Sequence, residues 1–259
     1  MAIRFKKIIQ EALKNVDLEE GDIVLLHSDS TVLRQMTSLN WAEVMNLLKD
    51  CFLTVLGDGG TLIVPTFNWD FCKGKSYVHE KTRSQVGMFT NFILSDELSI
   101  RSLHPIYSFA GIGPASNNIF HSISNSSFGE DSVFHRLHKL NAKIVLFNYD
   151  PGSTFVHYVE QKKGVDYRYL KKFKGRVICG KRNYVDEFDM NVRYLDREVI
   201  VSTKKLHKHL QMIGKMMGTQ IKNKIDIKML TCEDAYNVLL KKLNESPYYL
   251  LEKPPLYNS

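Results

Sequence analysis

The sequence predicts an α/β protein with a mixed central sheet flanked by helices and a smaller antiparallel subdomain. Short apolar runs alternate with amphipathic helical segments through the first part of the chain, as in sheets covered by helices. Residues 175–201 instead alternate between apolar and polar side chains, which is typical of antiparallel strands. We treat the chain as one unit, with a main α/β part (1–174), a small mixed subdomain (175–230) and a closing helix and tail (231–259).

The N-terminal half contains helices and strands in alternation. Apolar residues at helical spacing predict helices over 3–15, 41–56 and 86–94. Short apolar runs that end in Gly, Pro or small polar residues predict strands over 23–26, 61–64 and 106–113. Residues 116–133 are rich in Ser and Asn and are expected to be mostly loop.

The C-terminal half begins with a helix over 133–139, for which Ser132 is the expected N-cap, and a buried strand over 144–147. Ser153 or Thr154 can cap the next helix. Three strands are expected within 175–201, followed by a helix over 204–216, a strand over 224–230, and a last helix over 232–244 capped by Thr231.

The stretch from Lys143 to Glu160 carries the first candidate chemistry. Its strand is followed by the turn residues NYDPG and then by a helix on which His157 and Glu160 stand three residues apart. That spacing places both side chains on one face of the helix. A His and a carboxylate after a buried strand suit proton transfer or charge stabilisation. The alternative is an amphipathic helix with a surface histidine.

Two further clusters of polar residues lie next to predicted strands. His27, Ser28, Asp29 and Ser30 follow the first strand, where an open sheet commonly presents a site, although a simple helix cap would also explain them. Residues 101–108 contain Arg101, Ser102 and His104 before an apolar strand; a functional site and an internal hydrogen-bond network are both consistent with them.

Composition limits the classes of function. The formal net charge is +7, which suits a phosphorylated small molecule. The sequence contains no nucleic-acid module, no apolar run long enough to cross a membrane and no secretion signal, and its four cysteines lack the spacing of metal ligands. We therefore expect a cytoplasmic enzyme without metal, nucleic acid or membrane partners. Glycine-rich dinucleotide and phosphate loops and a G-x-S-x-G elbow are also absent from the sequence.

Five segments stand in a characteristic order along the chain: VLLHSDS (24–30), GTLIVPTF (60–67), RSLHPIYSFAGIG (101–113), FGEDSVFHRL (128–137) and STFVHYVE (153–160). Together they resemble the antibiotic N-acetyltransferase family, which comprises the aminoglycoside 3-N-acetyltransferases and their relatives. The resemblance runs from about residue 3 to the C-terminal helix. It implies acylation of an amine by acyl-coenzyme A and a fold different from the GNAT acetyltransferases.

The resemblance also implies roles for individual residues. The T-x-x-H-x-x-E element matches Thr154, His157 and Glu160, with His157 as general base, Glu160 orienting it, and Thr154 near the thioester oxyanion. Coenzyme A would be held by a second set of residues, namely His27, Ser28, Ser30, Arg101 and Ser102. The family's His-x-Ser element is kept only in part, because Asp29 stands at its third position.

A narrower resemblance concerns the substrate. TFNWDFCKGK (66–75) and HYVEQKKGVDYRYLKKFKG (157–175) are similar to the branch that acylates nucleotide-linked amino sugars for surface polysaccharides, such as the N-acyltransferase of anthrose synthesis. The expected substrate is therefore a dTDP-linked amino-dideoxy sugar, acylated by direct transfer. Its contacts would be Asp29, Asn68, Trp69, His104, Tyr167 and Arg168. The alternatives are an aminoglycoside 3-N-acetyltransferase and a metal-dependent hydrolase; a homodimer is left open.

Overall fold

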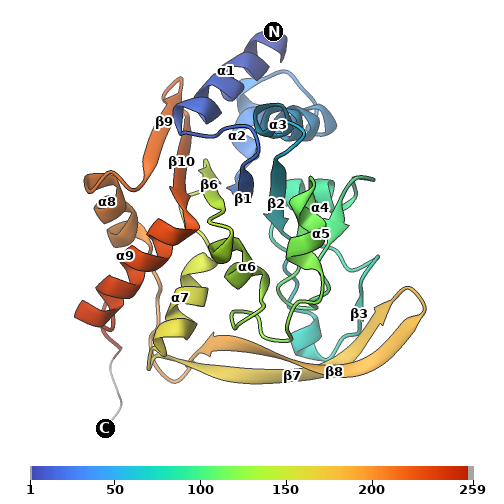
Figure 1. Ribbon diagram of the computed structural model, residues 1–259, viewed down its shortest axis with the longest axis vertical. Coiled ribbons are helices and arrows are strands. Elements are labelled where there is room, and N and C mark those ends of the chain that lie inside the picture. Colours follow the sequence, from blue (N-terminus) through green and yellow to red (C-terminus); the bar gives the residue numbers. More distant parts are fainter. Residues whose placement is uncertain (1, 256–259) are drawn as a thin grey trace.

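Among residues 2–255, which the computed structural model describes, seven strands form the central sheet in the order β4-β5-β2-β1-β6-β10-β9 (Figure 1). Their bounds are β1 (Ile23–Ser28), β2 (Thr61–Pro65), β4 (Ile100–Arg101), β5 (Phe109–Ile112), β6 (Lys143–Phe147), β9 (Met217–Ile221) and β10 (Ile225–Thr231). β1 is parallel to both β2 and β6, whereas the outer strands pair antiparallel. The sheet is therefore mixed, as predicted, and the carboxyl ends of β1 and β6 meet at one edge.

Helices cover both faces of this sheet. Side chains alternate along β1 and β6, so that Val24 and Val145 join one apolar core while Leu25 and Ile144 join the other. The first core lies under α1 (Ala2–Asn15), α2 (Thr31–Met36), α3 (Trp41–Leu56) and α4 (Met88–Leu94). The second lies under α5 (Ala115–Phe120), α6 (Val133–Lys139), α7 (Phe155–Lys163), α8 (Lys204–Met212) and α9 (Cys232–Glu245). Burial of both faces explains why the two central strands are continuous apolar runs.

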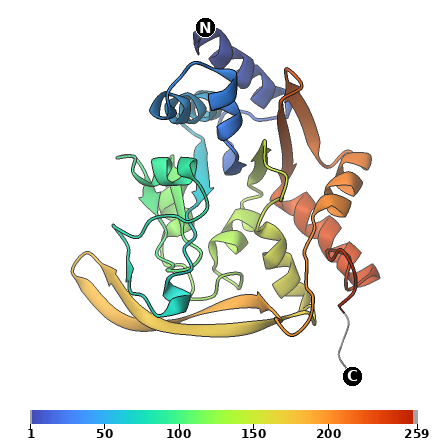
Figure 2. The same ribbon diagram turned by 180° about the vertical axis from the view of Figure 1, so that it is seen from behind.

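A second sheet contains β3 (Tyr77–Val78), β7 (Arg168–Cys179) and β8 (Arg182–Arg193). The long β7–β8 hairpin crosses the lower edge of the molecule in both ribbon views (Figure 2). A short 3₁₀ helix, η1 (Phe71–Lys73), packs on it. A Cβ at Gly175 would lie 2.7 Å from the Phe71 ring, so this close packing requires glycine.

The predicted fold class is confirmed, and most predicted elements are present with their expected caps. The side chains of Ser132 and Thr231 accept hydrogen bonds from the third residues of α6 and α9. Residues 198–201 form only an isolated bridge, Val201 to Leu251, instead of a strand. β9 was not predicted, and the helix expected over 204–216 ends at Met212.

The helix α5 lies in the segment that the sequence led us to expect as loop. Its Ser and Asn residues have low helix propensity, but Ile119 and Phe120 are buried in the second core. The guanidinium of Arg136 donates to carbonyls at the end of α5, those of Asn118, Ile119, His121 and Ser122. Tertiary contacts therefore override propensity here.

The segment predicted as one subdomain, 175–230, is divided between two sheets. β8 belongs to the small sheet, whereas β9 and β10 extend the central one. The hairpin also begins earlier, at Arg168. Residues 256–259 of the predicted tail lie outside the described residues.

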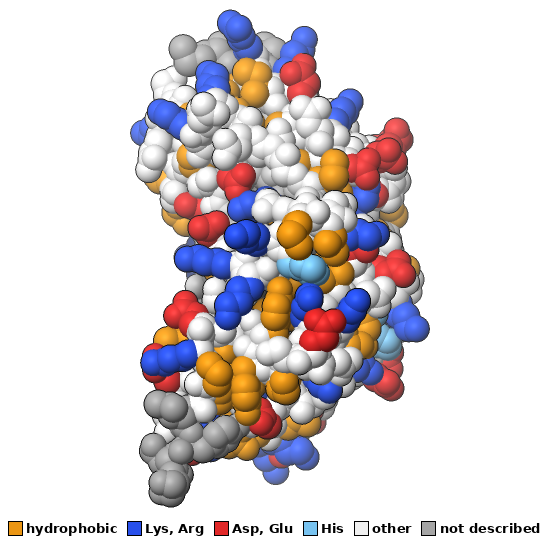
Figure 3. All heavy atoms as spheres, turned by 90° about the vertical axis from the view of Figure 1, so that its left-hand side faces the viewer, with side chains coloured by type: hydrophobic (Ala, Val, Ile, Leu, Met, Phe, Trp, Pro, Cys, Tyr) orange, Lys and Arg blue, Asp and Glu red, His pale blue; other side chains and the backbone are white. Residues whose placement is uncertain are grey.

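Part of the basic charge lies on the face formed by α8, α9 and β9. Figure 3 shows the face of α8, α9 and β9, on which Lys and Arg side chains surround a histidine and several apolar side chains. The helix α8 alone contributes Lys204, Lys205 and Lys208. No helix within residues 2–255 has the length and apolarity needed to cross a membrane.

Candidate active site

A cavity of about 210 Å³ opens at the carboxyl ends of β1 and β2, beside the start of α7. It is lined by Leu26, His27, Ser28, Pro65, Phe67, Trp69, Val86, Thr90, Tyr107, Tyr149, Thr154 and His157. Two histidines and several aromatic rings thus converge on one small space. A larger hollow of about 590 Å³ lies between α1 and residues 36–39, but its walls contain no histidine or carboxylate. We therefore place the candidate active site at the smaller cavity.

His157 and Glu160 form a hydrogen-bonded pair on α7. The Nδ1 atom of His157 lies 2.6 Å from Oε2 of Glu160. The His157 side chain is 23% exposed and lines the cavity, whereas the Glu160 side chain is fully buried. Since the carboxylate accepts the Nδ1–H, the other ring nitrogen, Nε2, is the one available to a substrate. This is the arrangement of a general base held by an orienting carboxylate.

Glu160 is held at both of its oxygens. The Tyr167 hydroxyl donates to Oε1 at 2.8 Å, and Arg168 Nε lies 2.7 Å from Oε2. The Arg168 Nε–H is not aligned with that oxygen, so this contact is an ion pair and not a hydrogen bond. Burial alone would raise the pKa of the Glu160 carboxyl, but the charges and hydrogen bonds of His157, Arg168 and Tyr167 outweigh it and lower that pKa.

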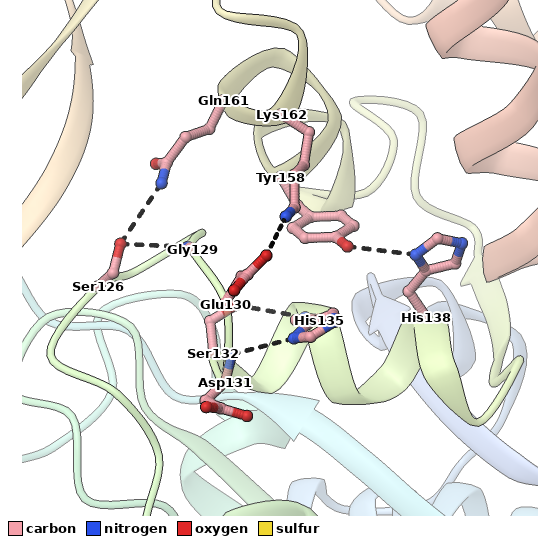
Figure 4. Close-up of polar contacts among 10 residues, drawn as sticks. All are labelled: Ser126, Gly129, Glu130, Asp131, Ser132, His135, His138, Tyr158, Gln161 and Lys162. Carbon is pink, nitrogen blue, oxygen red and sulfur yellow. Dashed lines mark hydrogen bonds and ion pairs between the residues drawn. The ribbon is translucent and has the colours of Figure 1, made fainter.

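The loop before α6 packs against α7 through polar contacts with Gln161 and Lys162 (Figure 4). Lys162 pairs with Glu130 at 3.1 Å, and Gln161 donates to Ser126. The ring of Phe128, in the same loop, meets the imidazole of His157 edge to face, with 5.7 Å between ring centroids. The FGEDS motif thus supports the catalytic candidate from outside the helix.

His27 reaches the cavity from the end of β1. Its Nε2 lies 2.8 Å from the Ser153 hydroxyl, and its ring stacks on Tyr149. Burial lowers the pKa of His27 to about 4, so the imidazole is neutral near pH 7. Ser153 also accepts the Phe155 N–H, so it is Ser153, and not the N-cap residue Thr154, that provides the side-chain hydrogen bond at the start of α7.

The structure brings together only some of the residues predicted for the site. His27, Ser28, Trp69, Thr154 and His157 all line the cavity. Three other predicted residues lie close in sequence but make local contacts outside the lining: Asp29 accepts from Thr31, Ser30 contacts Met45 Sδ, and Asn68 bonds to Arg83 and Asp70.

Arg101, Ser102 and His104 form the internal network that the sequence left as an alternative. All donor nitrogens of Arg101 are engaged, by the carbonyls of His79, Thr82 and Thr66 and by Ser108. Ser102 accepts the Phe109 N–H. The Nδ1 of His104 accepts two backbone N–H groups, and burial lowers the pKa of His104 to about 4. These contacts engage Arg101, Ser102 and Nδ1 of His104 inside the protein, whereas Nε2 of His104 is buried without a hydrogen-bond partner among the described residues. Their roles in binding stay predictions.

Tyr167 and Arg168, predicted to bind the substrate, point inward instead. Tyr167 is fully buried, and the side chain of Arg168 is 8% exposed. Both contact Glu160, because β7 starts directly behind α7. In this structure both residues hold Glu160, and their predicted contact with a substrate stays a prediction.

Sequence reasoning missed most of the aromatic wall. Phe67, Tyr107 and Tyr149 line the cavity together with Thr90. One signal was available: Tyr149 and Phe67 follow strands β6 and β2 almost directly, at the edge where a site was expected.

Within residues 2–255, no three His, Cys, Asp or Glu side chains are grouped so that they could hold a metal ion.

Comparisons with known proteins support this assignment of the fold. A family model described as aminoglycoside 3-N-acetyltransferase matches residues 25–244. No curated protein matches the chain. Among solved structures, the aminoglycoside acetyltransferase AAC(3)-Xa aligns with a TM-score of 0.78 at 14% identity, covering 96% of this chain and 94% of that one.

Two further structures are similar. AAC-IIIb, solved as a binary complex with CoASH, aligns with a TM-score of 0.78 at 11% identity and covers 96% of this chain and 98% of its own. YokD from Bacillus subtilis aligns with a TM-score of 0.74 at 18% identity, covering 93% and 99%. At these identities the likeness concerns the fold.

The mixed sheet with a His–carboxylate pair beside its carboxyl edge thus defines an N-acyltransferase that takes its acyl group from coenzyme A, as predicted. The chain belongs to the aminoglycoside 3-N-acetyltransferase family.

Proposed function

We propose that this protein transfers an acyl group from acyl-coenzyme A to the amine of a nucleotide-linked amino sugar, with His157 as general base. The observation that carries the proposal is the His157–Glu160 pair, 2.6 Å apart, at the wall of the cavity. In the reaction, the neutral amine attacks the thioester carbonyl and the C–S bond breaks. The proton lost by the amine passes through Nε2 of His157 to the departing thiolate.

Other cavity residues would bind the reactants. His27 and Ser28 are retained for coenzyme A, and Thr154 for the thioester oxygen, because all three line the cavity. The aromatic wall, including Trp69 and Tyr107, would pack against the sugar and the nucleotide base. The homodimer left open from the sequence stays a prediction.

The charges favour an anionic acceptor over an aminoglycoside. No Asp, Glu, Lys or Arg lines the cavity, and Glu160, which contacts His157 from behind the wall, is paired with Arg168. A polycationic aminoglycoside would be bound there without a counter-charge, whereas a net charge of +7 attracts a nucleotide diphosphate.

The four free cysteines, Cys51, Cys72, Cys179 and Cys232, suit a reducing compartment, so the cytoplasm remains the proposed location.

The test is a measurement of thiol release from acetyl-coenzyme A and from longer acyl donors. The acceptors are dTDP-linked amino-dideoxy sugars, with kanamycin beside them. Release with the sugar nucleotide and none with kanamycin supports the proposal. Release with kanamycin alone assigns the protein to aminoglycoside acylation. Release with neither acceptor, for every donor, contradicts the proposed reaction.

A further inference from the structure

Glu160 is a buried carboxylate, and the number of positive charges in contact with it depends on whether His157 is protonated. Three groups contact it: His157 Nδ1, Tyr167 Oη and Arg168 Nε. When His157 is protonated, its positive charge lies against the carboxylate. When His157 is neutral, as a base must be before it accepts a proton, Arg168 is the cation that remains in contact with Glu160.

A carboxylate in a fully buried site takes up a proton unless a charge or several hydrogen bonds stabilise its ionised form. A protonated Glu160 could no longer accept the Nδ1–H of His157 in the same way. The ring would then lose the partner that fixes its tautomer and leaves Nε2 free for the substrate.

We propose that Arg168 and Tyr167 are positioning residues, which keep Glu160 ionised and in one orientation while His157 is neutral and active as the base. This inference rests on the proposed function, in which His157 takes the proton. Arg168 is itself fixed, because its Nη1 donates to the Asn191 carbonyl on β8 at 3.1 Å. The small sheet thus holds Glu160 in place through Arg168, without contact with the substrate.

Four other titratable side chains near the His157–Glu160 pair are His27, Tyr107, Tyr149 and Tyr167. Across the cavity, His27 has a pKa lowered to about 4 by burial, and Tyr149 has a raised pKa. Burial raises the pKa of Tyr107 to about 12, and burial followed by the charge of Glu160 raises that of Tyr167 still further. Near pH 7, His27, Tyr107, Tyr149 and Tyr167 are therefore all neutral.

The prediction for Arg168→Gln follows from charge balance. Without the guanidinium, Glu160 is compensated only by a protonated His157, so the imidazolium persists to higher pH. The acid limb of the pH–rate profile should move up by about one unit or more, as expected for a charge removed within a few ångströms. At pH values below that limb, one unit corresponds to about a tenfold lower rate. Arg168→Lys keeps the charge and should recover most of the rate, and Tyr167→Phe should have a smaller effect than Arg168→Gln.

The experiment has two readouts on the full chain. The first is the NMR titration of the His157 imidazole nitrogens in the free protein, with the His157→Gln spectrum to assign the signals. The second is the pH profile of thiol release with acetyl-coenzyme A and the dTDP-linked amino sugar. Arg176→Gln is the matched control, since Arg176 lies on the same strand with an exposed side chain bonded to Asn183.

An upward shift of the His157 titration in Arg168→Gln, with none in Arg176→Gln, supports the inference. A wild-type titration and pH profile in Arg168→Gln and Arg168→Lys would overturn it, even if His157→Gln is inactive. If instead the titration shifts but His157→Gln turns over normally, the positioning contact stands and the base role in the proposed function fails. Should Arg168→Gln not fold, Tyr167→Phe gives the titration test, with a smaller shift expected, and Arg168→Lys, which keeps the charge, is its control.

Discussion

His27 and Ser153 connect two elements that are far apart in the sequence. The Nε2 atom of His27, near the end of β1, lies 2.8 Å from the Ser153 hydroxyl, just before α7. Both side chains are buried, and Ser153 also accepts the first free N–H of the helix, that of Phe155. The contact therefore fixes the start of the helix that carries His157 against the central sheet.

Replacing Ser153 by Ala should destabilise the protein. The change leaves a buried imidazole nitrogen and the Phe155 N–H without their partner, so we expect a loss of about 1–3 kcal/mol in the free energy of unfolding. Urea denaturation at pH 7 measures it. Ser246→Ala, at an exposed position after α9, should change stability by less than about 0.5 kcal/mol. Equal stability of the two variants would contradict the linking role.

The His157→Gln variant should lose catalysis and keep its fold. Without a general base, kcat should fall by about 10²–10⁴-fold, while the melting temperature changes little because the side chain is partly exposed at the cavity. Steady-state kinetics and circular dichroism measure the two effects. His121→Gln is the control, since His121 is exposed and away from the cavity lining. Unchanged kcat in His157→Gln would remove the assignment of the base.

Trp69 should contribute to binding of the acceptor. It lines the cavity, and removing its ring in Trp69→Ala should raise the KM for the amino sugar nucleotide by about tenfold, with less effect on kcat. The same change at Trp41, which is 43% exposed at the start of α3, should leave KM unchanged. A tenfold effect on the KM of acetyl-coenzyme A instead would place the ring against the other substrate.

Arg101 should affect stability and not coenzyme A binding. Its guanidinium donates to three backbone carbonyls and to Ser108, which fasten the segment 66–82 to the sheet. Arg101→Lys leaves several of these acceptors unpaired and should cost about 2–4 kcal/mol in chemical denaturation. The KM for acetyl-coenzyme A should stay within about twofold, as in the exposed control Arg182→Lys. A large rise in that KM at normal stability would restore the coenzyme A role predicted from the sequence.

The free energy of unfolding should fall as the pH is lowered through the titration range of the buried histidines. Burial lowers the pKa of both His27 and His104 from 6.5 to about 4, so the unfolded chain binds protons more readily between these values. Their contribution is fully present above pH 6.5 and is lost progressively down to about pH 4.

Urea denaturation at several pH values between about 4 and 7 measures this slope. In His104→Asn the amide oxygen can accept the two N–H groups now bound by Nδ1, and the slope should become shallower. The same slope in the variant as in the natural protein would contradict the prediction.

The pairing of His157 with Glu160 could be predicted from spacing, because residues three apart on a helix share a face. The sequence also predicted the apolar runs of β1 and β6 and the caps at Ser132 and Thr231, since these features depend on neighbouring residues. The helix α5 could not be predicted from its own residues, because burial of its apolar side chains and hydrogen bonds from the Arg136 guanidinium stabilise it.

The sequence by itself determined the fold class and the chemistry available to this protein: an α/β sheet, with a His and a carboxylate presented after a buried strand. Only the tertiary structure decided how the other polar residues are used. Arg101 and Arg168 have the same side chain, yet the first binds backbone carbonyls and the second pairs with Glu160. The physical reason is that a buried cation is stabilised by the groups that the fold places around it, and those groups belong to other elements: the segment 66–82 for Arg101, and α7 and β8 for Arg168.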